Sequence, residues 1–234
     1  MSIENFYLYN VIFLLFLLGC SKIKHLDPLY VDSRDKKLAV NDYKMGMLEL
    51  NKIENGETRY RKALHYVEKA IKQSKNPIYM AQKATLLFLL NNVDESLKCF
   101  QEALKIPAHE SVRSDIMNNY ACVIAKTGDT KKALLLFEKL EKDKNYFTPE
   151  VAIVNQARIY YDDGKFNLAK KKLCQATRLA QDYVDAHYYL GLTCYRLENY
   201  KDAMQALDKT IQLESGHEAA ISLREECCKK LTIC

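Results

Sequence analysis

The stretch AIVNQARIYYDDGKFNLAKKKLCQA, residues 152–176, contains the spacing that decides the fold. Small Ala157 is followed twelve positions later by small Ala169, then by large apolar Leu173 and small Ala176. Gly164 lies between the first two, where a left-handed residue would turn one helix back along the next. Two helices approach closely only where neither carries a bulky side chain. The spacing therefore predicts a helical hairpin.

The same spacing recurs along the chain, at steps of 37, 36 and 34 residues. The small residues equivalent to Ala157 are Ala84, Ala121 and Gly191, and those equivalent to Ala169 are Ser96, Ala133 and Ala203. Phe100, Phe137 and Leu207 occupy the large apolar position, and Ala103, Leu140 and Thr210 complete the units. Self-similarity at this period indicates stacked helical hairpins, and a unit of about 34 residues is typical of tetratricopeptide repeats.

We therefore predict an all-α, right-handed solenoid of about five tetratricopeptide-type helical hairpins followed by a C-terminal capping helix. The expected hairpins are residues 38–76, 77–109, 114–147, 150–183 and 184–217, and the capping helix is residues 218–231. In the first hairpin the inter-helix turn, Asn51 to Tyr60, is expected to be longer than the others. The chain has only seven Gly and four Pro, which argues against the many turns of an all-β fold.

The N-terminus carries an apolar run of thirteen residues, 6–18, interrupted only by Asn10. A membrane span needs about 20 residues, so the run fits the apolar region of a secretory signal better. Residues 17–21, LLGCS, resemble a bacterial lipobox, which implies cleavage before Cys20 and acylation of that cysteine. The segment before the run departs from this pattern, because it holds Glu4 and no Lys or Arg. An uncleaved apolar anchor and a misassigned start codon are the alternatives.

These features predict the organisation of the chain. Residues 1–19 form a lipoprotein signal peptide, residues 20–37 a lipidated tether, and residues 38–234 the repeat domain. The net charge is +5, but the basic residues alternate with acids along helix faces, which favours solvated surfaces over nucleic-acid binding. No Cys-x-x-Cys motif or metal-ligand spacing of His is present, nor a Gly-rich phosphate loop. We therefore expect no metal, no cofactor and no enzymatic activity.

The middle of the chain resembles a particular family. Asn118-Asn119-Tyr120-Ala121, then Tyr146-Phe147-Thr148-Pro149 and Asn155-Gln156-Ala157, are similar to the third and fourth repeats of the type IV pilus biogenesis lipoproteins, the PilF/PilW-type pilotins. That family has Gly where Ala121 stands, and Asn-Ala-Gly where residues 155–157 stand. The resemblance covers residues 115–205. It implies a lipoprotein on the periplasmic face of the outer membrane that helps a secretin ring to localise and assemble. The alternative is a tetratricopeptide lipoprotein that serves β-barrel assembly or scaffolds cell-wall hydrolases.

A partner is expected on the concave face, which the first helices of stacked hairpins line. The positions expected there are Ile78, Ala81, Thr85 and Phe88; Asp115, Asn118, Cys122 and Ala125; Val151, Val154, Arg158 and Tyr161; and Asp185, Tyr188, Leu192 and Tyr195. Aromatic and apolar residues with an Arg favour protein contact.

The candidate partner-binding residues are Phe88, Asn118, Asn119, Val154, Asn155, Arg158, Tyr161, Tyr188 and Tyr195. Asn119 and Asn155 could hydrogen-bond the backbone of an extended partner. Three alternatives remain open. The Asn side chains would bond within their own repeat, Phe88 would belong to the core, and the tyrosines would pack between neighbouring hairpins.

Overall fold

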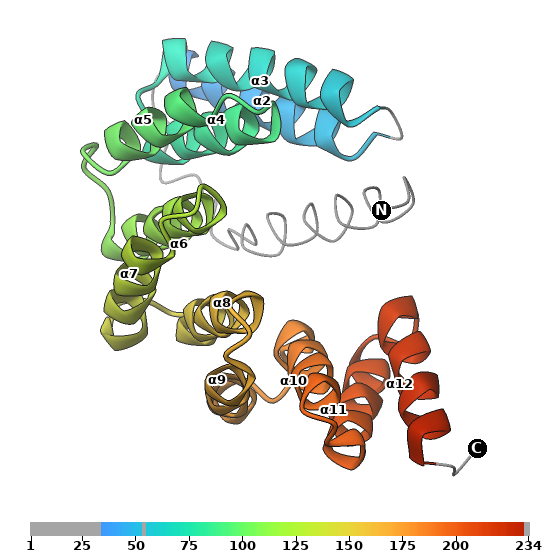
Figure 1. The fold of residues 1–234 in the computed structure, drawn as a ribbon. Helices are drawn as coiled ribbons and strands as arrows, with labels where there is room; N and C mark the ends of the chain where they lie inside the picture. Colours follow the sequence, from blue (N-terminus) through green and yellow to red (C-terminus); the bar gives the residue numbers. More distant parts are fainter. Residues whose placement is uncertain (1–33, 53–54, 232–234) are drawn as a thin grey trace. The chain divides into compact units, whose positions relative to one another are not determined.

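The computed structural model describes residues 34–52 and 55–231. Within these ranges the chain forms eleven α-helices and no strand (Figure 1). They are α2 (Arg34–Leu50), α3 (Gly56–Gln73), α4 (Pro77–Leu89), α5 (Val93–Ala103), α6 (Glu110–Lys126), α7 (Thr130–Lys142), α8 (Pro149–Asp162), α9 (Phe166–Leu179), α10 (Val184–Arg196), α11 (Tyr200–Leu213) and α12 (Glu218–Leu231). None of these described helices is long and apolar enough to span a bilayer. The predicted signal peptide and Cys20 lie outside the described residues.

The helices belong to two compact units that divide between Gly128 and Asp129. In the first unit, α2 packs on α3 and α4 on α5, and each pair contacts the next helix along the chain. In the second unit, α8 packs on α9 and α10 on α11, and α12 covers α11. First helices of consecutive hairpins also touch: α4 with α6, α8 with α10, and α10 with α12. Among the described helices, the main contacts join neighbouring hairpins, as a helical solenoid requires, and the predicted all-α tetratricopeptide-type fold is confirmed.

The core includes the positions that recur in the sequence. All the small and large repeat positions are buried, including Phe100, Phe137, Leu173 and Leu207, each at most 1% exposed. Ser96 fits a position that is Ala in the other copies because its hydroxyl donates to the Ala84 carbonyl oxygen at 2.6 Å. The predicted register of the repeat is therefore confirmed.

The turns share one backbone feature. Gly128 and Gly164 have φ of +98° and +73°, as expected from their repeat position. Asn91 and Glu198 occupy the same repeat position and also have positive φ, 62° and 60°. Asn adopts this conformation more readily than most residues, whereas Glu has no such preference. The left-handed backbone conformation at this position thus belongs to the repeat as a whole. Only two of the four copies have the glycine that makes it recognisable in the sequence.

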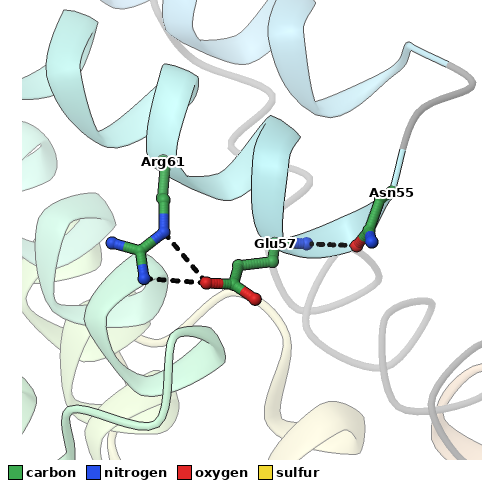
Figure 2. Close-up of polar contacts among 3 residues, drawn as sticks. All are labelled: Asn55, Glu57 and Arg61. Atoms are coloured by element: carbon green, nitrogen blue, oxygen red, sulfur yellow. Dashed lines mark hydrogen bonds and ion pairs between the residues drawn. The ribbon is translucent and has the colours of Figure 1, made fainter.

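Two helix starts differ from the sequence prediction because of local capping. The predicted turn from Asn51 to Tyr60 is too long, since α3 already begins at Gly56. The Asn55 side chain caps α3 by accepting from the Glu57 backbone N–H at 3.0 Å, and the Arg61 guanidinium donates to Glu57 Oε1 at 2.7 Å (Figure 2). Similarly, α6 begins at Glu110 rather than at residue 114. The His109 ring caps it by accepting from the Ser111 backbone N–H. Residues 34–37 of the predicted tether are helical.

A polar network joins three helices of the second unit. Glu141 of α7 accepts hydrogen bonds from Lys172 at 2.7 Å, from Gln156 at 2.7 Å and from Gln175 at 2.9 Å. Burial by itself would raise the pKa of Glu141, but the hydrogen bonds from Lys172, Gln156 and Gln175 outweigh it and lower that pKa. The carboxylate is therefore stabilised in its charged form by the fold.

We expect Glu141→Gln to reduce the free energy of unfolding by about 1–3 kcal/mol at neutral pH, because a charged acceptor of several hydrogen bonds is lost. The pKa of Glu141 is lower in the folded state than in the unfolded chain. Its contribution to the free energy of unfolding is therefore fully present above the unfolded pKa of about 4.5, and it is lost as the pH falls through the lower folded pKa. In urea denaturation, the difference in the free energy of unfolding between wild type and Glu141→Gln should be smaller near pH 3 than near pH 7. A difference that does not change with pH would contradict this role.

Candidate partner-binding surfaces

The second unit brings four of the predicted binding residues onto adjacent helices. Arg158 and Tyr161 lie on α8, Tyr188 and Tyr195 lie on α10, and these helices are in contact. All four side chains are partly exposed. The partly exposed tyrosines and arginine therefore present one surface that spans two first helices.

The Tyr189 ring on α10 packs against the guanidinium of Arg158, whose charge also acts on Asp185 of the same helix. The central carbon of the guanidinium lies 4.7 Å from the centroid of the Tyr189 ring, a cation–π distance. Burial raises the pKa of the Asp185 carboxyl, and the nearby charge of Arg158 and a 3.4 Å hydrogen bond from the Tyr183 hydroxyl oppose that shift. Arg158 is thus oriented before any partner binds, which limits the entropy it would lose on binding.

The predicted tyrosines also pack against neighbouring rings. Tyr161 meets Phe166 edge-on at 5.3 Å, and the Arg196 guanidinium lies 4.9 Å from the Phe166 ring. The Tyr188 ring lies 4.6 Å from that of His217 at the start of α12. Because these side chains are half-buried, partner contact and packing between hairpins, the two roles left open by the sequence, are not exclusive. Each ring packs against a neighbouring ring and still keeps part of its surface exposed.

Tyr195 has a similar dual position. Its ring meets that of Tyr200 edge-on at 5.6 Å, and a hydrogen bond with Glu226 of α12 is the main cause that raises its pKa. This contact links α10 to the capping helix. Among the side chains that shape the surface, Tyr189, Phe166 and Arg196 were not predicted. In the sequence, the only feature of these residues is that they lie near repeat positions. Other residues of the same helices share that feature, so it does not single them out.

Three predicted residues lie in the interior of the repeats. Asn118 and Val154 are 1% exposed and Asn155 is 3% exposed, so their side chains do not reach the surface of this structure. They lie where the first helix faces the neighbouring helices. Phe88 is half-buried near the end of α4, and Asn119 lines a pocket between α4 and α6 in the first unit. Partner contact by these residues stays a prediction, and Asn118, Val154 and Asn155 are poorly placed for it.

Within residues 34–52 and 55–231, no group of three His, Cys, Asp or Glu side chains could hold a metal ion. Free thiols occur at Cys99, Cys122, Cys174, Cys194 and Cys227. Burial raises the pKa of Cys99 and Cys227, and raises that of Cys194 to about 11. A thiol is a nucleophile only as thiolate, so these three are poor candidates for covalent catalysis.

Comparison with known proteins agrees with the fold. Residues 154–217, about a quarter of the chain, match the tetratricopeptide repeat family. The crystal structure of PilW, a widely conserved type IV pilus biogenesis factor, is 21% identical with a TM-score of 0.67, over 84% of this chain and 87% of PilW. Pseudomonas aeruginosa PilF is 14% identical with a TM-score of 0.68, over 86% of this chain and 87% of PilF.

A tetratricopeptide repeat protein from Parabacteroides merdae is also similar, with 13% identity and a TM-score of 0.57 over 84% of this chain and 75% of that protein. No curated protein matches the chain significantly. At such identities the likeness concerns the fold. Residues 154–217 match the tetratricopeptide repeat family, and the described chain has the same tetratricopeptide-type fold as these solved structures.

Proposed function

We propose that this protein is a non-enzymatic outer-membrane lipoprotein scaffold that binds a secretin subunit and assists its localisation and assembly in type IV pilus biogenesis. The observation that carries the proposal is the likeness to PilW and PilF, which extends over more than four-fifths of each chain. The residues that resemble the pilotin family, including Asn118 to Ala121 and Tyr146 to Pro149, lie in the middle of the chain. Cys20 would attach the protein to the periplasmic face of the outer membrane.

The surface of the second unit suits this role. Tyr161, Tyr188 and the oriented Arg158 are residue types that carry much of the energy of protein interfaces. Tyrosine rings are rigid, and they bury a large apolar area while losing little rotational freedom. A guanidinium can also bond a carboxylate or two backbone carbonyls at once. We propose that this surface is where the secretin subunit binds.

Copurification with the secretin from the same cells tests the proposal. We expect the full-length, affinity-tagged protein, solubilised in mild detergent, to recover the secretin subunit in stoichiometric amount. Deleting the gene should reduce the sodium dodecyl sulfate-resistant secretin multimer while the total amount of secretin stays the same. Recovery of β-barrel assembly proteins or cell-wall hydrolases in place of the secretin would contradict the proposal and favour the alternative adaptor role.

Cys20→Ala separates anchoring from binding in the same cells. Several acyl chains, at about 0.8 kcal/mol per buried CH₂, make an anchor effectively permanent. We expect the variant to lose the lipid mass and to leave the outer-membrane fraction, with Ser21→Ala as the matched control that keeps both. Unchanged mass and fractionation of Cys20→Ala would contradict lipidation while leaving secretin binding to be judged by copurification.

A further inference from the structure

The net positive charge of the chain is concentrated in its first hairpin. Residues 34–76, which include α2 and α3, hold eleven Lys or Arg and six Asp or Glu, a net charge of +5. The rest of the sequence holds twenty-four of each and is neutral overall. A surface of one sign attracts ligands of the opposite sign, and salt weakens the attraction. The first hairpin therefore suits an anionic partner better than the other hairpins do.

The basic side chains of α3 gather on one exposed side. Lys62, His65, Lys69 and Lys72 are all exposed and follow one another at spacings of three, four and three residues, which places them along one side of the helix. An open hollow joins this row to the end of α2, and it is lined by Glu49, Lys52, Arg61, Lys62, His65 and Tyr66. Basic residues that come from both helices of the hairpin thus share one surface.

The outer side of α2 combines basic and apolar residues. Arg34, Lys37, Lys44 and Leu48 are exposed and lie at spacings of three, seven and four residues, again along one side of a helix. Leu48 is 56% exposed, and Leu38, next to Lys37, is 45% exposed. Because α2 is the first described helix, no described hairpin precedes it to cover this side. Long basic side chains around exposed leucines are typical of helices that lie on a bilayer surface.

The acids of the hairpin are too few to balance its basic residues. Two of them form ion pairs inside the hairpin, with Lys52 and with Arg61. A third, Glu68, pairs with Lys83 of α4 at 2.9 Å and so compensates a charge outside the hairpin. Even if every acid of residues 34–76 were paired within the hairpin, a charge of +5 would remain.

We propose that the first hairpin lies on a bilayer surface that contains anionic phospholipid. The lysines of α3 would lie beside the phosphate groups, and the exposed leucines of α2 would lie at the boundary with the acyl chains. The proposal rests on the lipid anchor of the proposed function. Fourteen residues lead from Cys20 to Arg34 and, at about 3.5 Å per residue, keep the hairpin within about 50 Å of the membrane. This proximity and the exposed leucines favour a bilayer over an acidic protein.

Binding to vesicles tests the proposal without the acyl anchor. Residues 20–234 with Cys20→Ala contain every described residue and lack the apolar run 6–18, which would bind a bilayer by itself. We expect this chain to sediment with vesicles of phosphatidylcholine that contain about 30% phosphatidylglycerol. Binding should be at least about tenfold weaker with phosphatidylcholine alone, and also at high salt. Equal binding to both kinds of vesicle, or binding to neither, would overturn the proposal.

Two matched variants locate the contact. Replacing Lys62, Lys69 and Lys72 of α3 by Gln should weaken binding to the anionic vesicles at least about tenfold, since each basic residue near such a surface adds to the attraction. The control removes three lysines of α7 at the equivalent repeat positions: Lys132→Gln, Lys139→Gln and Lys142→Gln. The α7 variant should bind like the parent, because only the first hairpin is proposed to lie on the bilayer. Circular dichroism checks that both variants fold.

The remaining outcomes are equally decisive. Equal weakening by the α3 and α7 variants would overturn the proposal, because the attraction would then follow the total charge of the chain and not the first hairpin. Binding of polyglutamate in the absence of vesicle binding would overturn it in favour of an acidic protein partner. Because neither the secretin nor an acyl chain takes part, failure here leaves the copurification and the fractionation of Cys20→Ala to be judged separately.

Discussion

Gly191→Val is expected to lower the free energy of unfolding by about 3 kcal/mol, the upper part of the usual range for overpacking in a core. A Cβ atom at Gly191 would lie 2.6 Å from Leu207 Cγ, 2.8 Å from Leu207 Cδ2 and 3.3 Å from the Ala203 carbonyl oxygen. Leu207 is fully buried in a close-packed core, so it can move only by displacing its neighbours. The two extra methyl groups of valine would make the conflict between α10 and α11 worse.

Urea denaturation of the two full-length proteins measures this effect. Gly216→Ala is the matched control, because a Cβ atom there meets nothing within 4 Å, and its midpoint should stay close to that of the wild type. If Gly191→Val unfolds at the same urea concentration as the wild type, α10 and α11 do not approach as closely as the repeat spacing and the structure indicate.

The spacing of small residues made the fold predictable. Ala157, Ala169 and their equivalents are buried at the contacts between helices, and a close contact tolerates few residue types. The constraint repeats in each hairpin, so it appears in a single sequence as a period. Helix starts are less constrained. The caps by Asn55 and His109 depend on side-chain geometry at one position, and neither residue carries a periodic signal.

The candidate surfaces were predicted less well, for a physical reason. A first helix of a solenoid contacts its own partner helix and the hairpins before and after it, so only a narrow strip is exposed. Helical spacing alone placed Asn118 and Val154 on that strip, and the structure buries both. The contact of Arg158 with the Tyr189 ring depends on how α8 and α10 pack, which a single repeat does not encode.

The second large effect concerns capture of the secretin by the surface of α8 and α10. We expect the double replacement Tyr161→Leu with Tyr188→Leu to weaken capture at least about tenfold, since buried tyrosines at interface centres commonly contribute that much. Leucine keeps most of the apolar bulk that packs near Phe166 and His217, so the thermal unfolding midpoint should change little. Binding is measured by surface plasmon resonance with the purified secretin subunit.

The corresponding alanine pair shows why leucine is the informative change. Tyr161→Ala with Tyr188→Ala removes rings that are half-buried, so it should lower both capture and the unfolding midpoint, and it cannot separate binding from packing. Tyr60→Leu, a half-buried tyrosine of second helix α3, is the control and should bind the secretin like the wild type. If the leucine pair binds normally while the alanine pair does not, the tyrosines act by packing their helices together. The partner would then have to be held elsewhere, with Arg158 as the first residue to test.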